Sequence, residues 1–279
     1  MTYLHCMSIL LKLKDKIKMK HVTPNAFLIS ETRIDEDNFQ SFLNEIGVPE
    51  WSTDADTDTE VVIETAGKLC YMSFDTSLNQ NLTRTGTRNN YDYIQQGLIS
   101  TKHGSVLEHG TVTLMLTNVS RVLTHELVRH RAGAAYSQTS GRYVRLDDLP
   151  FWVPSCIKEN PELEKLFVDE ILHQEETIKK MAEITKIDTL DFKAKKTLTS
   201  AFRRIIGNGL ANNITATYNH RALRHVIEMR TSHHAEEEIR LLFNKVFELV
   251  GNRYPSIYGD AELTMIDGYN EIIFKHGKV

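Results

Sequence analysis

The chain lacks the features that mark secreted, membrane or nucleic-acid-binding proteins. It has three cysteines, an odd number spread far apart at Cys6, Cys70 and Cys156, whereas a secreted disulfide scaffold uses an even, closely spaced set. We therefore expect a reducing, cytoplasmic environment. No run approaches the ~18 apolar residues of a membrane span. The formal net charge of -4 argues against general binding to nucleic acid or to a membrane surface.

The basic stretch at residues 120–145 also contains no cysteine. Its first half predicts an amphipathic helix that is capped by its opening serine and ends on the triplet Arg129-His130-Arg131. A small-residue loop and a polar turn follow and lead to Arg142. Guanidinium groups gathered around such a turn suit bidentate capture of phosphate. The alternative is a charged helix end, in which the arginines interact favourably with the helix dipole.

The whole chain, with 279 residues and 41% hydrophobic content, can bury a full core as one large domain. Strands are expected at residues 11–20, 25–32, 111–116 and 214–218, and helices at residues 35–46, 60–71, 91–100, 162–186 and 190–206. Asp267-Gly268 predicts a hairpin in the tail. The pattern predicts an α+β fold: a mixed or antiparallel sheet flanked by helices, with an added helical cluster at residues 161–206.

The segment from His103 to His109 carries titratable side chains directly before a predicted strand. Its spacing is not that of the helical zinc-binding motifs, because four residues separate His103 from Glu108. A zinc site would need further ligands from elsewhere in the chain. The plainer alternative is that Glu108 and His109 satisfy local backbone groups.

A second group of polar residues follows the predicted strand at 214–218. On a helix, Arg221 and His225 share one face, while Arg230 falls at the edge of the neighbouring apolar face. An arginine placed there is costly unless a carboxylate or a ligand meets it. An ion pair with one of the glutamates at 236–238 is the structural alternative, and the adjacent His233-His234 pair could bind a metal adventitiously.

These blocks together resemble the flavin-dependent thymidylate synthases. Arg129-His130-Arg131 followed by Ser140-Gly141-Arg142-Tyr143 is similar to that family's signature. The His-x-Ser-x-x-Glu-His segment that begins at His103, the Asn-x-Arg-x-x-x-His segment that begins at Asn219, and AEEEIR at 235–240 occur in the family's order. One departure is visible, because residues 132–139 hold one residue more than the family usually places between the triplet and the serine.

The resemblance implies two sets of site residues. Those expected at FAD are Ser105, Arg129, His130, Arg131, Gln138, Asn219, Arg221 and His225, with His103 and Glu108 positioning the flavin or the folate. Those expected at dUMP are Glu126, Arg129, Gln138, Thr139, Ser140, Gly141, Arg142, Arg203 and Arg230. Arg230 is the expected catalytic residue and would favour ionisation at N3 of the uracil. No resident metal is implied.

The implied reaction is reductive methylation of dUMP to dTMP, with methylenetetrahydrofolate as carbon donor and NADPH as reductant of the FAD. The family's hydride attack on the pyrimidine agrees with the absence of a cysteine among the arginines. A paralogue that modifies another pyrimidine nucleotide, and a non-catalytic nucleotide-binding protein, are the alternatives. Arg203 matches an arginine that, in the family, reaches the nucleotide from a neighbouring subunit. The resemblance therefore implies a homotetramer.

The resemblance covers roughly residues 66–249 and suggests three segments. Residues 1–60 form an N-terminal extension with the first strands. Residues 61–251 form the flavin- and nucleotide-binding catalytic domain, and residues 252–279 form a hairpin tail. The pair Ile206-Gly207 stands where the family often has Leu-Pro, so the end of the preceding helix is expected to differ in shape.

Overall fold

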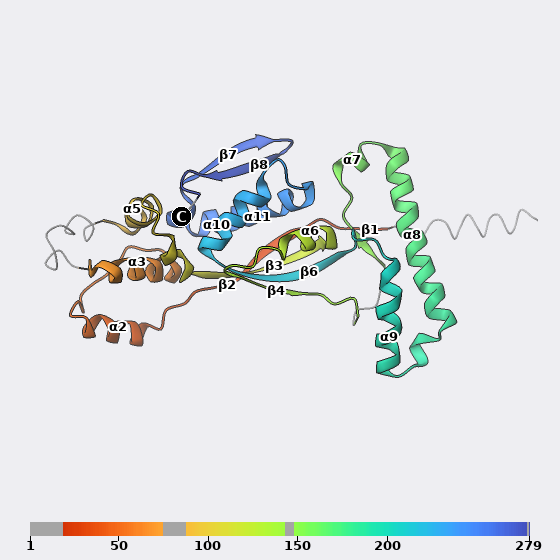
Figure 1. The fold of residues 1–279 in the computed structure, drawn as a ribbon, viewed down its shortest axis with the longest axis horizontal. Coiled ribbons are helices and arrows are strands. Elements are labelled where there is room, and N and C mark those ends of the chain that lie inside the picture. The colour runs from red at the N-terminus through yellow and green to blue at the C-terminus, as the bar shows by residue number, and fades with distance from the viewer. Residues whose placement is uncertain (1–18, 75–87, 143–147, 278) are drawn as a thin grey trace, which may run out of the picture. The chain divides into compact units, whose positions relative to one another are not determined.

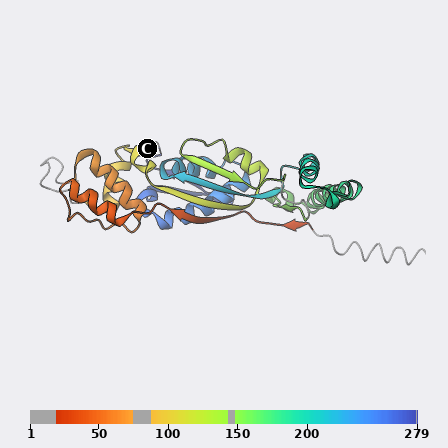
Figure 2. The ribbon, with the colours of Figure 1, turned by 90° about the horizontal axis from the view of Figure 1, so that it is seen from below.

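The structure, a computed structural model, describes residues 19–74, 88–142, 148–277 and 279. The strand expected at 11–20 lies mostly outside these ranges, as do Tyr143 and most of the polar loop at 77–90. The fold is α+β, as the sequence predicts. A four-stranded sheet has the order β2 (Asn25–Glu31), β3 (Thr111–Ser120), β6 (Ala211–Asn219) and β4 (Ala134–Gln138), which can be followed in Figure 2.

The chain divides into two compact units. Unit 1 comprises residues 1–24, 117–126 and 138–214, and unit 2 comprises residues 25–116, 127–137 and 215–279.

The core of unit 2 is formed around α10 (His220–Thr231), which packs against α11 (Glu237–Arg253) and the hairpin strand β8 (Tyr269–Phe274). Leu223, Val226 and Ile227 form the buried stripe of α10 that the sequence predicts. Asn219 caps the helix, because its Oδ1 accepts a hydrogen bond from the Ala222 N–H at 2.8 Å. The helix therefore begins where a local sequence signal places it.

The tail of unit 2 is the predicted hairpin. Strand β7 (Ala261–Ile266) pairs antiparallel with β8, with Ile266 opposite Tyr269. Asp267 and Gly268 join the two strands with φ of 53° and 83°. Both values lie in the left-handed region that a two-residue hairpin turn of this kind requires, which is why Asp-Gly is a strong hairpin signal.

Helices α2 (Glu36–Glu45) and α3 (Asp58–Tyr71) lie side by side in unit 2 (Figures 1 and 2). A short α5 (Asn90–Asp92) runs on into a π-helical segment, Tyr93–Ile99, and a 3-10 turn, Gly104–Glu108, precedes β3. A further short helix of unit 2, α12 (Pro255–Tyr258), follows α11 directly. These elements agree with the helices expected at 35–46, 60–71 and 91–100.

Unit 1 holds the added helical cluster. Helix α8 (Pro161–Ile184) and α9 (Phe192–Phe202) form a hairpin joined by the 3-10 turn Ile187–Thr189 (Figure 1). Asn160 caps α8, with proline at its first position, and Asp191 caps α9. The short strands β1 (Lys20–His21) and β5 (Pro150–Phe151) pair in parallel, and α7 (Ser155–Lys158) follows them. A hydrophobic cluster of this unit contains Met19, Leu149, Phe151, Val153, Ile171 and Ile178.

Two local expectations were wrong. Helix α6 (Arg121–Leu127) begins behind the predicted cap, where the Leu123 N–H donates to Ser120 Oγ at 3.0 Å, but it ends before the Arg-His-Arg triplet. Residues 134–138, which composition assigned to a loop and a turn, form strand β4 beside β6. Pairing with a strand far away in sequence outweighs the weak β-propensity of two alanines.

Candidate functional site

Unit 2 contains a cavity of about 790 Å³ that gathers side chains from separate segments of the sequence. Its lining residues are Glu108, Arg129, His130, Arg131, Ala132, Gly133, Asn219, Arg221, Ala222, His225, Val226, Gly277 and Val279. Six of the eight residues expected at FAD are among them. Ser105 is not; it is exposed on the 3-10 turn that also carries Glu108.

The loop that carries the triplet is fastened to the start of α10. The Asn219 N–H donates to the Gly133 carbonyl at 2.9 Å. Gly133 has φ of 66°, and a Cβ at this position would overlap the Asn219 side-chain amide. Glycine is therefore required here for its backbone conformation and for the close approach. This junction places the triplet and the first turn of α10 on one cavity.

His130 and Arg230 meet within this unit, although 100 positions separate them in the sequence. Arg230 Nε donates a hydrogen bond to His130 Nε2 at 2.8 Å. Burial lowers the pKa of His130 to about 4, assisted by the positive charge of Arg230 and by His225 and Arg129. The imidazole is therefore neutral near pH 7. The ring of His225 lies edge-on to it, 5.9 Å between centroids.

Arg221 points its guanidinium toward a carboxylate and a backbone carbonyl. Its Nη1 donates to Glu108 Oε1 at 2.5 Å, and its Nε donates to the Val279 carbonyl at 2.8 Å. Both members of the ion pair are about half exposed, so solvent screens it and it contributes little stability. An anionic ligand can therefore compete with Glu108 for Arg221 at small cost.

A second basic hollow lies in unit 1. It has a volume of about 230 Å³ and is lined by Arg121, Gly141, Arg203, Arg204, Ile206, Gly207, Asn208 and Leu210. Burial lowers the pKa of Arg121, and the neighbouring charge of Arg203 lowers it further. Two guanidinium groups placed this close favour an anion between them.

The turn beside this hollow is held by polar contacts within unit 1. Gln138 Nε2 donates to Thr124 Oγ1 at 3.0 Å and to Asn212 Oδ1 at 2.6 Å. The Thr139 N–H donates to the Asn213 carbonyl, and the Arg142 N–H donates to Ser140 Oγ. The two remaining nucleotide candidates of this unit differ in exposure: Glu126 is half-buried on α6, and Arg142 is exposed.

The sequence interpretation missed Arg121. Arg121 directly follows the capping Ser120, but an arginine in the first turn of a helix gives no functional signal until a second guanidinium lies beside it. The structure brings Arg203 and Gly141 to Arg121 in unit 1 and brings Arg230 to His130 in unit 2. That all these groups meet at one nucleotide stays a prediction.

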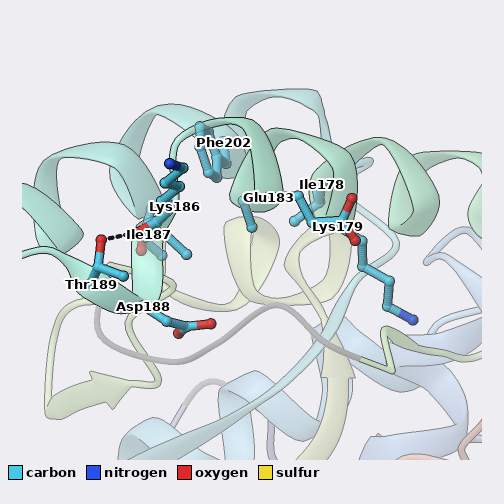
Figure 3. Close-up of a pocket in the computed structure, with 10 residues that line it drawn as sticks. Ile178, Lys179, Glu183, Lys186, Ile187, Asp188, Thr189 and Phe202 are labelled. Atoms are coloured by element: carbon cyan, nitrogen blue, oxygen red, sulfur yellow. Dashed lines mark hydrogen bonds between the residues drawn. The ribbon is translucent and has the colours of Figure 1, made fainter.

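A third hollow, of about 370 Å³, lies between α8 and α9 in unit 1 (Figure 3). Apolar side chains such as Ile178 and Phe202 line it together with charged ones of both signs. The Thr189 hydroxyl donates to the Lys186 carbonyl at 2.8 Å and closes the turn between the helices. None of the expected site residues lines it.

The alternatives that invoked a metal gain no support. His233 Nδ1 lies 3.0 Å from Glu271 Oε1, and the described residues contain no group of three histidine, cysteine, aspartate or glutamate side chains arranged to hold a metal ion. Within the same ranges, no helix combines the length and the apolar character needed to cross a bilayer.

Comparison with known proteins adds independent findings. The family model described as thymidylate synthase complementing protein, Thy1, matches residues 53–256. A flavin-dependent thymidylate synthase of Mycolicibacterium vanbaalenii is 34% identical over 227 residues, which cover 80% of this chain and 87% of the relative. One from Mycobacterium avium is 35% identical over 232 residues, covering 81% and 89%.

Solved structures with the same fold are more distant in sequence. A UMP/dUMP methylase, PolB, from Streptomyces cacaoi bound with 5-Br UMP superimposes with a TM-score of 0.57 at 15% identity, covering 86% of this chain and 95% of that one. Thymidylate synthase X from Helicobacter pylori with FAD and dUMP gives 0.50 at 18% identity, covering 85% and 98%. On the family match and the identity to the mycobacterial relatives, this chain belongs to the Thy1 family, the flavin-dependent thymidylate synthases.

Proposed function

We propose that the protein converts dUMP to dTMP, with FAD as its cofactor, methylenetetrahydrofolate as carbon donor and NADPH as reductant. The observation that carries the proposal is the 790 Å³ cavity of unit 2, on which the Arg-His-Arg triplet and the start of α10 converge. A cavity of this size is typical of cofactor sites. The named relatives and the H. pylori structure with FAD and dUMP support it.

The residues around the cavity fit an anionic flavin nucleotide. Arg129, Arg131 and Arg221 supply guanidinium forks suited to a diphosphate. Neutral His130 and the Asn219 side chain supply polar groups without adding charge. FAD, when bound and reduced, supplies the hydride of the reaction. Ser105, His225 and Gln138 remain proposed flavin contacts on the family resemblance.

We assign the nucleotide phosphate to the basic hollow of unit 1, with Arg203 and Arg142 as its principal holders. Arg230 then stabilises negative charge on the polarised uracil, a type of help worth a few kcal/mol. Glu126, Arg129 and the segment 138–141 complete the proposed nucleotide contacts. No cysteine lines the unit 2 cavity in the described chain, which agrees with a reaction that needs no enzyme thiolate.

A second candidate is a methylase that also accepts UMP. Ile206 and Gly207, where the chain departs from the family pattern, line the same hollow as Arg203. The extra residue in 132–139 lies shortly before Gly141 in the sequence, and Gly141 also lines this hollow. A change of shape beside the phosphate site can alter which sugar the enzyme tolerates, and the match to a UMP/dUMP methylase points the same way.

Product analysis tests both candidates. Purified protein loaded with FAD is given methylenetetrahydrofolate and NADPH with either dUMP or UMP, and the nucleotides are separated by chromatography. The proposal expects a flavin absorption spectrum and dTMP formed from dUMP in preference to a methylated product from UMP. Equal methylation of both nucleotides would favour the second candidate. Flavin-loaded protein that methylates neither would refute both.

The assembly and the division of the chain are also proposals. We propose a homotetramer in which Arg203 reaches the nucleotide of a neighbouring subunit, with residues 61–251 as the catalytic segment. Mixing two inactive variants, Arg203→Ala and Arg230→Ala, tests the shared site. Mixed tetramers regain part of the activity if one site takes residues from two chains, and they stay inactive if each chain forms its own.

A further inference from the structure

We infer that His130 is a positioning residue that orients the guanidinium of Arg230, in addition to any contact it makes with the cofactor. The inference rests on the proposed function, because that function assigns Arg230 to the uracil. The contact itself is the bond from Arg230 Nε to His130 Nε2 at 2.8 Å.

The chemistry of the two groups fixes the direction of this bond. Arginine has no acceptor and keeps its proton at every accessible pH, so His130 must accept through an unprotonated Nε2. A neutral imidazole with an unprotonated Nε2 carries its proton on Nδ1. Protonation of Nε2 would leave two cationic donors facing each other and would break the contact.

The bond constrains the whole plane of the guanidinium. Nε and both terminal nitrogens of arginine lie in one rigid plane, so an acceptor that fixes the direction of Nε–H also fixes how the outer fork is turned. Arg230 is half-buried on a helix, and its side chain has several rotatable bonds between Cα and this plane. A partner at Nε removes part of that freedom before the substrate arrives, which is the preorganisation that electrostatic catalysis requires.

His130 can hold Arg230 in one orientation because both its own backbone N–H and its own backbone carbonyl are hydrogen-bonded. The His130 N–H donates to the Leu127 carbonyl at 3.1 Å, at the end of α6. The Tyr136 hydroxyl, on β4, donates to the His130 carbonyl at 2.9 Å. Burial raises the pKa of Tyr136, so this hydroxyl stays a donor. The rings of Tyr136 and buried Tyr218 pack edge to face, 5.8 Å between centroids.

The charged and titratable groups around His130 come from its own loop and from the elements packed against it. Among the described residues they include Arg129 and Arg131 from the loop, Arg221, His225 and Arg230 from α10, Tyr136 from β4 and Tyr218 from β6. Glu108, which lines the same cavity, is paired with Arg221. The arginines add positive charge and the tyrosines are neutral, so this surrounding set disfavours a second proton on His130. The imidazole therefore remains an acceptor throughout the physiological range.

Two substitutions of His130 with side chains of equal polarity distinguish its effect on the orientation of Arg230 from its effect on cofactor binding. In His130→Gln, the side-chain oxygen can stand where Nε2 stands and accept from Arg230. In His130→Asn, the shorter side chain reaches only the position of Nδ1 and leaves Arg230 Nε without this acceptor. Both variants are neutral and polar. His173→Gln, an exposed histidine of α8, is the matched control.

With FAD and dUMP saturating, we expect kcat of the Asn variant to lie about tenfold or more below kcat of the Gln variant, the equivalent of one hydrogen bond to a charged group. Flavin content is read from the visible spectrum of both variants, because His130 also lines the proposed flavin cavity. Equal losses in the two variants would overturn the inference, as would losses that follow flavin content.

A readout independent of activity is the pKa of His130, followed by NMR titration of the imidazole in the full chain. Replacing Arg230 by glutamine removes the neighbouring charge, and we expect the pKa of His130 to rise; an unchanged value would overturn the pairing. If wild-type protein methylates no pyrimidine nucleotide, the proposed function fails, and this titration alone then decides whether the two side chains are coupled.

Discussion

A deeply buried ion pair of unit 2 gives a large expected change in stability. Arg224, on α10, reaches Asp260 with both guanidinium arms, Nη1 to Oδ1 at 2.6 Å and Nη2 to Oδ2 at 2.9 Å. The side chains are only 2% and 4% exposed. The guanidinium also donates to the Ile257 carbonyl and lies 4.0 Å from the centre of the Phe274 ring. The pair therefore ties α10 to the turn that precedes the hairpin.

Replacing Arg224 by methionine leaves the Asp260 carboxylate buried, with the His276 N–H at 3.1 Å as a remaining donor. Breaking one side of a buried pair costs about 3–5 kcal/mol. Because total stability is about 5–15 kcal/mol, this is a large share. At about 2–4 °C per kcal/mol for a chain of this size, the melting temperature should fall by roughly 6 °C or more.

Urea and thermal unfolding at one fixed protein concentration measure the effect. Arg33→Met is the control, because the Arg33 side chain is 73% exposed and its ion pairs are long; we expect it to change stability by less than about 0.5 kcal/mol. The double variant Arg224→Met with Asp260→Leu should be more stable than Arg224→Met alone, since no buried charge is left unpaired. An Arg224→Met variant within about 1 kcal/mol of wild type would refute the reasoning.

Two further predictions concern the phosphate hollow and acid stability. Arg203→Ala and Arg121→Ala should each weaken dUMP binding about tenfold or more through loss of a charged hydrogen bond, measured by titration calorimetry; an equal loss for deoxyuridine, which has no phosphate, would refute the assignment. Burial lowers the pKa of His220 to about 3. Because the unfolded chain binds this proton at a pKa of about 6.5, stability should fall as pH drops from about 6.5 toward 3. His220→Asn, which can keep a partner for the Tyr258 hydroxyl, should flatten that slope in urea midpoints, and an unchanged slope would contradict the assignment.

Local sequence signals were sufficient to predict the elements whose structure depends on residues close together in the sequence. The Asn219 cap, the apolar stripe of α10 and the Asp267-Gly268 turn all rest on hydrogen bonds or side-chain spacing within a few residues. The capped helices α8 and α9 belong to the same class. These elements, and the α+β fold that they imply, could be predicted from the order of residues because each satisfies its backbone locally.

Contacts between distant segments were decided only by the tertiary structure. The sequence marked Arg230 as the misplaced arginine of α10, yet the buried one is Arg224, which pairs with Asp260. Arg230 donates a hydrogen bond to His130. Arg121 becomes a candidate anion contact only because Arg203 lines the same hollow. Spacing along a helix tells which side chains share a face, but burial and pKa depend on what packs against that face. That partner is set by the folding of the whole chain.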